Sequence, residues 1–131
     1  MKTCVTINMN PYPFKLFVFS QHSLKEIVNK VNKQGFNLKQ EELIIENNEE
    51  ILGKSFLFHR FCIIYLPDFT FSSMSLAALV HELFHIIEMI MTDIDIKLSD
   101  DSSESFAYLL DYSFKECLNQ FIKNTKLNTI V

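Results

Sequence analysis

The sequence predicts an α+β domain built on a small twisted mixed sheet. Stretches rich in aromatic and β-branched residues occupy the first half of the chain, and a helix-period apolar pattern lies between them. Two long helix-period segments fill the second half. With 131 residues and no internal repeat or linker, the chain is expected to form a single domain over residues 1–131, large enough to bury a core.

The composition excludes several functional classes. A net charge of −4 argues against a general nucleic-acid binder, which would carry a basic patch. The first ten residues lack the apolar core of a signal peptide. The longest apolar stretch, residues 74–91, contains His81, Glu82, His85 and Glu88, so we expect no membrane span. The 3 cysteines are widely spaced, which favours reduced thiols in the core of a cytoplasmic protein.

The first half of the chain predicts a strand followed by an amphipathic helix. Residues 14–19 follow a Pro-Tyr-Pro turn and are mostly aromatic or β-branched. Ser23 and Glu26 have the spacing of a capping box, apolar residues then recur at helical spacing, and Gly35 ends the helix. This unit should therefore run from a strand into a helix that ends near Gln34.

The middle of the chain gives weaker signals. Residues 43–45 suit either a short strand or the end of a helical turn, and residues 46–50 form a polar connector. Residues 55–58 and 61–66 read as two strands joined tightly at His59 and Arg60, or as one long bent strand.

Two long helices are predicted after these strands. The first runs from about residue 74 to 91, with Ser73 or Ser75 as its N-cap. The second runs from about residue 101 to 124, after a connector at residues 92–99. Its apolar residues recur at spacings of three and four and so define one buried face: Phe106, Leu109, Leu110, Phe114, Cys117, Leu118 and Phe121.

The first long helix carries the motif His-Glu-x-x-His at residues 81–85. Residues four apart lie on one helix face, so His81 and His85 can direct two imidazoles at one ion. Glu82 is placed beside that ion and suits a general base that takes a proton from water. This pattern is typical of zinc hydrolases, and Zn²⁺ is the expected cofactor.

A catalytic zinc needs a third protein ligand, and Glu104 is the candidate. It lies in the first turn of the second long helix, far enough along for the chain to reverse and return a carboxylate. Capping or a favourable charge at the helix start is the alternative role. The weaker ligand candidates are Asp93, Asp95, Asp100, Asp101, His22 and His59, and Asp111 is a candidate partner for a histidine ligand.

The motif at residues 81–85, followed by a helical Glu104, resembles the gluzincin branch of the zincin metallopeptidases. Residues 104–110 are also similar to small metallopeptidase-like proteins found in bacteriophage genomes. The resemblance covers residues 61–117, about half of the chain. It implies a minimal zincin-like domain: a small twisted sheet on the helix that carries the two histidines, and a C-terminal helix that supplies the glutamate.

The resemblance also implies a site and a substrate. An edge strand, residues 61–66 or the segment before it, would pair with an extended peptide. His81, His85 and Glu104 would hold zinc, and Glu82 would act as the base. Tyr108 and Tyr112, one and two turns beyond Glu104, are the candidates for stabilising the transition state, and packing or a surface position is their alternative role. The chain lacks the separate helical domain of large gluzincins. The expected function is therefore a zinc metallopeptidase acting on a peptide or protein in the cytoplasm.

Three other hypotheses stay open at this point. In the first, the chain is a zincin-like protein that binds zinc without catalysis and serves as an interaction module, for example in a phage. In the second, the chain hydrolyses another amide, such as a peptidoglycan cross-link, because the same zinc chemistry cleaves both kinds of bond. In the third hypothesis the motif is accidental, which should occur in well under about one in a hundred chains of this length.

Overall fold

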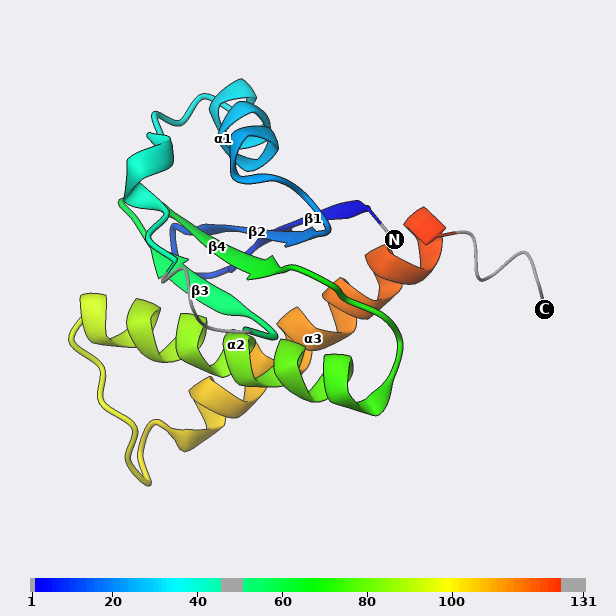
Figure 1. Cartoon of the computed structure of the whole chain (residues 1–131). Helices are drawn as coiled ribbons and strands as arrows, with labels where there is room; N and C mark the ends of the chain where they lie inside the picture. Colours follow the sequence, from blue (N-terminus) through cyan, green and yellow to red (C-terminus); the bar gives the residue numbers. More distant parts are fainter. Residues whose placement is uncertain (1, 46–50, 126–131) are drawn as a thin grey trace.

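A four-stranded mixed sheet forms the centre of the fold, with α1 on one face and α2 and α3 on the other (Figure 1). The computed structural model describes residues 2–45 and 51–125. Its α+β content confirms the predicted fold class. The elements are β1 (Thr3–Asn8), β2 (Lys15–Ser20), α1 (Leu24–Lys33), the 3-10 turn η1 (Gln40–Glu42), β3 (Lys54–Leu57), β4 (Phe61–Leu66), α2 (Ser73–Asp93) and α3 (Ser103–Thr125).

The strands lie in the order β1-β2-β4-β3. The two central strands, β2 and β4, run parallel, and β1 and β3 pair with them antiparallel at the two edges. The parallel pair requires a long crossover, and α1 lies within it. Because helices cover both faces, the central strands are buried almost throughout and consist largely of apolar residues.

Local sequence signals explain where α1 begins and ends. The Ser23 side chain accepts a hydrogen bond from the Glu26 amide at 3.1 Å, and the Glu26 carboxylate accepts one from the Ser23 amide at 2.9 Å. This reciprocal pair is the predicted capping box. Beyond the helix, Gly35 has a φ of 95°, which a residue without a Cβ adopts at little cost.

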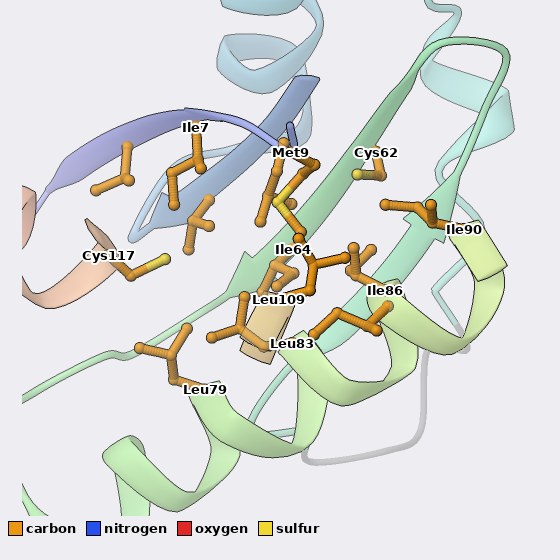
Figure 2. Packing of buried hydrophobic residues seen from close by; sticks show 14 of the residues in the cluster. Ile7, Met9, Cys62, Ile64, Leu79, Leu83, Ile86, Ile90, Leu109 and Cys117 are labelled. Carbon is orange, nitrogen blue, oxygen red and sulfur yellow. The ribbon is translucent and has the colours of Figure 1, made fainter. Parts of the chain in front are cut away.

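Two apolar layers hold the fold together, one on each face of the sheet. Figure 2 shows the larger layer, in which Leu79, Leu83, Ile86 and Ile90 of α2 face the side chains of the sheet and of α3. The smaller layer packs α1 onto the opposite face through Phe17, Phe19, Ile27, Val31 and their neighbours. Burial of these faces removes apolar surface from water, which is the main force for folding.

Several predicted boundaries need correction. β1 was not predicted, although its side chains alternate between buried and partly exposed, because Thr and Asn interrupt its apolar pattern. α2 is capped by Ser72, whose Oγ accepts from the Ser75 amide at 3.2 Å, so neither Ser73 nor Ser75 is the N-cap. α3 begins at Ser103, two residues later than predicted. Residues 43–45 form no strand, and residues 46–50 lie outside the described part of the chain.

The remaining predicted elements are confirmed. β3 and β4 form two strands joined at His59 and Arg60, with Arg60 at a φ of 69° in the tight connection. The predicted apolar face of α3 is buried or partly buried at every position. All three cysteines are free thiols, and burial raises the pKa of Cys62 and Cys117, as expected for core thiols.

α2 is long and apolar enough to cross a membrane by length and composition alone, with a mean hydropathy of 1.5. α2 includes residues 74–91, the segment for which no membrane span was predicted because it contains histidine and glutamate residues. In the structure, seven of its residues are buried in the domain, including Leu79, Leu83, Ile86 and Ile90. A core helix of a folded domain passes the same test, so this helix is weak evidence for a membrane and the fold is consistent with a non-membrane protein.

His22 predicts a pH dependence of stability. The residue is 3% exposed, its Nδ1 lies 2.9 Å from the Ser20 carbonyl, and its Nε2 has no hydrogen-bond partner among the described residues. Burial lowers the pKa of His22 in the fold, because a proton on Nε2 would lack an acceptor. The unfolded chain therefore binds the proton first, and the free energy of unfolding should fall as the pH drops below about 6.5.

Urea unfolding from pH 7.5 to pH 5 measures this effect. The matched variant is His22→Asn, whose amide can still donate to the Ser20 carbonyl but does not titrate. Its free energy of unfolding should fall less over the same pH range than that of the wild type. Equal slopes for the two proteins would contradict the prediction.

Candidate metal and catalytic site

His81 and His85 stand together on the exposed side of α2. Their Nε2 atoms are 3.0 Å apart, and their rings are nearly perpendicular, with an angle of 82° between the planes. The pair points outward because apolar residues such as Leu83 and Ile86 occupy the opposite side of the helix. The sequence prediction that the two imidazoles share a face is confirmed.

The spacing of these two nitrogens fits one metal ion. Zinc binds imidazole nitrogen at about 2.0–2.1 Å, so two ligands of one ion lie no more than about 4.2 Å apart. The separation of 3.0 Å between the Nε2 atoms of His81 and His85 satisfies this limit. Imidazole nitrogens are also ligands that zinc prefers, so the pair is suitable as half of a zinc site.

Glu82 lies beside the pair but is turned inward, and only 7% of its surface is exposed. Its carboxylate accepts a hydrogen bond of 2.6 Å from the Ser55 hydroxyl. The same hydroxyl lies 3.1 Å from the backbone carbonyl of Glu82. Burial of a carboxylate is unfavourable without such a partner, so Ser55 of β3 holds the side chain at the seam between the edge strand and the helix.

Gly53 completes the environment of Glu82. A Cβ at this position would lie 2.8 Å from Cγ of Glu82 and 3.1 Å from a methyl carbon of Leu66. The missing side chain therefore leaves the space that the Glu82 side chain fills. Neither Gly53 nor Ser55 was predicted as a site residue, and the only sequence signal for either was that Gly53 is one of just 2 glycines.

A Gly53→Ala substitution should displace Glu82. The added methyl group requires the carboxylate to move away from Ser55, and overpacking of this kind costs about 1–3 kcal/mol of stability. We expect a lower unfolding midpoint in urea and slower peptide cleavage by the same variant.

The matched control for this substitution is Gly35→Ala. A Cβ at Gly35 meets nothing within 4 Å, but the φ of 95° disfavours alanine. It should therefore also destabilise the fold, by about 1 kcal/mol, without disturbing Glu82. If both variants lose activity in proportion to stability alone, Gly53 has no specific role at the site.

Glu104 and Tyr108 lie together in a different hollow, of about 380 Å³, which Pro11 and Tyr12 also line. None of its lining residues is shared with the hollows that contain His81. In the described residues, no group of three or more His, Cys, Asp or Glu side chains is close enough to hold a metal ion. The structure thus brings His81, His85 and Glu82 together but places neither Glu104 nor Tyr108 beside them.

The other candidate residues are scattered. Asp93 is the last residue of α2, and Tyr112 stacks on Tyr108 with ring centroids 6.5 Å apart. His22 is buried, and its ring contacts that of Phe19, whereas His81 and His85 are exposed. The remaining candidates are exposed: His59, Asp95, Asp100, Asp101 and Asp111.

Comparison with known proteins assigns the chain to no family. No protein-family model matches the chain, and neither the curated proteins nor the solved structures contain a match.

Proposed function

We propose that the protein is a zinc-dependent metallopeptidase in which His81 and His85 are metal ligands and Glu82 is the general base. One observation carries the proposal: two imidazole nitrogens 3.0 Å apart stand next to a carboxylate that is buried and hydrogen-bonded by Ser55. Helix periodicity alone explains why the two histidines share a face. A buried glutamate between a core helix and an edge strand is costly for folding, so its presence there favours a functional role. Glu104 stays the proposed third ligand, supported by the motif and its spacing.

The chain's own residues supply the rest of the chemistry. A zinc ion in such a site acts as a Lewis acid and brings the pKa of water into the neutral range. Glu82 accepts a proton from the attacking water and passes it to the leaving amine. Ser55 keeps the carboxylate in place through its hydrogen bond, and Gly53 leaves the space it needs.

The edge strand β3 supports a peptide as the substrate. The Phe58 amide donates to the Phe61 carbonyl at 2.9 Å, and this pair sets the alternation of the β3–β4 ladder. It follows that the backbone groups of Ser55 and Leu57 point away from β4, toward the outer edge of the sheet. An extended peptide can pair with them and pass the histidines. Of the two segments expected to form the edge, β3 takes this place and β4 lies inside the sheet.

A specific observation favours a second candidate, an inactive zinc-binding interaction protein. Glu104 lies apart from the histidine pair, and catalytic zinc sites have three protein ligands. This candidate predicts bound metal without hydrolysis. A phage-encoded origin and a cytoplasmic location are part of the proposal.

Metal analysis combined with a cleavage assay tests the proposal. Purified without chelators, the protein should carry about one zinc per chain and cleave unfolded casein or a mixture of fluorogenic peptides. A chelator should abolish the cleavage, and added zinc should restore it. Metal without cleavage supports the second candidate, and a protein that binds no zinc contradicts both.

A further inference from the structure

Three hollows follow one another along α2 and β3, and together they form what we call the seam groove. The first, of about 470 Å³, is lined by Leu52, Met74 and Ala77 and reaches His81. The second, of about 380 Å³, contains both histidines and shares His81 with the first. The third, of about 410 Å³, is lined by Leu57, Glu88 and Asp93, and Met89 joins it to the second.

One end of the seam groove is apolar. Leu52 is 57% exposed and Met74 is 64% exposed, and both line the first hollow beside Ala77. Glu82 is the only charged residue that lines this hollow in the described part of the chain, and its carboxylate is bonded to Ser55. An apolar side chain placed there would remove this exposed apolar surface from water.

The other end of the seam groove is acidic. Glu88 and Asp93 are exposed in the third hollow, and neither forms an ion pair with a described residue. The groove's lysine, Lys54, lines the middle hollow instead. Lys54 is accompanied there by the carboxylate of Glu82, so the charges of the middle hollow offset each other. A positive charge is therefore attracted chiefly to the far end of the groove.

The direction of β3 relates these two ends to the direction of a bound peptide. β3 begins at Lys54, directly after Gly53 of the apolar end, and ends at Leu57, which lines the acidic end. Antiparallel pairing is somewhat more stable than parallel pairing. A peptide paired antiparallel with β3 runs from the acidic end to the apolar end.

We propose that the seam groove selects peptides with a basic residue on the amino side of the cut bond and an apolar residue on the carboxyl side. This proposal rests on the proposed metallopeptidase function. The helix rises about 1.5 Å per residue, and an extended peptide spans about 3.3 Å per residue. Measured from the middle of the His81–His85 pair, Glu88 and Asp93 then face residues about two to five positions before the bond. Ala77 and Met74 face residues about three to four positions after it.

A set of quenched-fluorescence peptides of equal length tests the proposal. The set places Lys, Ser or Glu before the bond and Leu or Ser after it, in every combination. The Lys–Leu peptide should have the highest kcat/KM, with about a three- to tenfold advantage of Lys over Ser. Replacing Leu by Ser should cost about tenfold or more. The advantage of Lys should shrink at high salt, because exposed charges are screened.

Two double variants locate the charge preference. Glu88→Gln with Asp93→Asn should remove the advantage of Lys while the Leu preference stays. Glu41→Gln with Asp68→Asn removes the same charge at exposed positions outside the groove and should leave the advantage intact. If the first pair has no effect, or if Glu before the bond is preferred, the proposal is wrong.

A binding measurement keeps this test separate from the test of activity. The same peptides, without quenchers, are titrated into the Glu82→Gln variant and followed by fluorescence anisotropy. The Lys–Leu peptide should bind most tightly, and tighter binding of the reversed Leu–Lys peptide would overturn the antiparallel alignment. Cleavage of all peptides at one rate, with equal affinities, overturns the groove preference and leaves the proposed function standing. Failure to cleave any peptide counts against the proposed function, while the affinities still decide the groove.

Discussion

Replacing Glu82 by glutamine should abolish peptide cleavage while the protein keeps its metal and its fold. Glutamine has nearly the same shape, and its carbonyl oxygen can still accept the Ser55 hydroxyl hydrogen bond of 2.6 Å. An amide cannot take a proton from water, however, and general-base catalysis contributes about 10²–10⁴ to a rate. We therefore expect kcat/KM to fall by at least about 10².

The measurement compares initial rates for wild type and Glu82→Gln at equal zinc content. Glu41→Gln is the matched control, since it removes one carboxylate from an exposed position and should leave kcat/KM unchanged. The urea midpoint of Glu82→Gln should be close to that of the wild type, because a buried carboxylate is replaced by a neutral group. A Glu82→Gln variant that cleaves at more than a tenth of the wild-type rate would show that this residue is not the base.

Most of the fold could be predicted because its signals are local. The Ser23–Glu26 capping box, the helix-period apolar residues of α3 and the tight connection at His59 and Arg60 each depend on residues close in sequence. β1 escaped prediction since its strand character depends on pairing with β2, a contact that its own polar residues obscure. The predicted starts of α2 and α3 differ from the observed ones by a few residues, and Ser72 was not predicted as the N-cap of α2. In both places several neighbouring serines could serve as the cap.

In the candidate site, too, local features could be predicted from the sequence and non-local contacts could not. The His81–His85 pair follows from helix geometry alone, so the sequence was sufficient to predict it. The contact of Glu82 with Ser55 joins residues 27 positions apart, and the packing of Glu82 on Gly53 is equally non-local. Neither contact has a sequence signature. The position of Glu104 depends on how α3 packs against α2, which spacing along the chain does not determine, and this explains why the expected third ligand lies in another hollow.

Replacing either His81 or His85 by alanine should remove the zinc. Each variant loses one of two nitrogens that lie 3.0 Å apart, and one imidazole with one carboxylate is too small a ligand set to hold the ion against solvent. Zinc content measured by mass spectrometry should fall from about one ion per chain to less than about a tenth. His59→Ala is the matched control, because His59 is exposed in the β3–β4 connection and should not affect zinc binding.

The same measurement on Glu104→Gln decides how the site is completed. Loss of zinc from this variant supports the three-ligand site and requires the first turn of α3 to approach the histidine pair when metal binds. Retention of zinc leaves His81 and His85 as the protein ligands, which favours the inactive interaction protein over the enzyme. If His81→Ala and His85→Ala both keep a full complement of metal, the motif on α2 is not the binding site. The pair would then be two surface histidines that share a helix face.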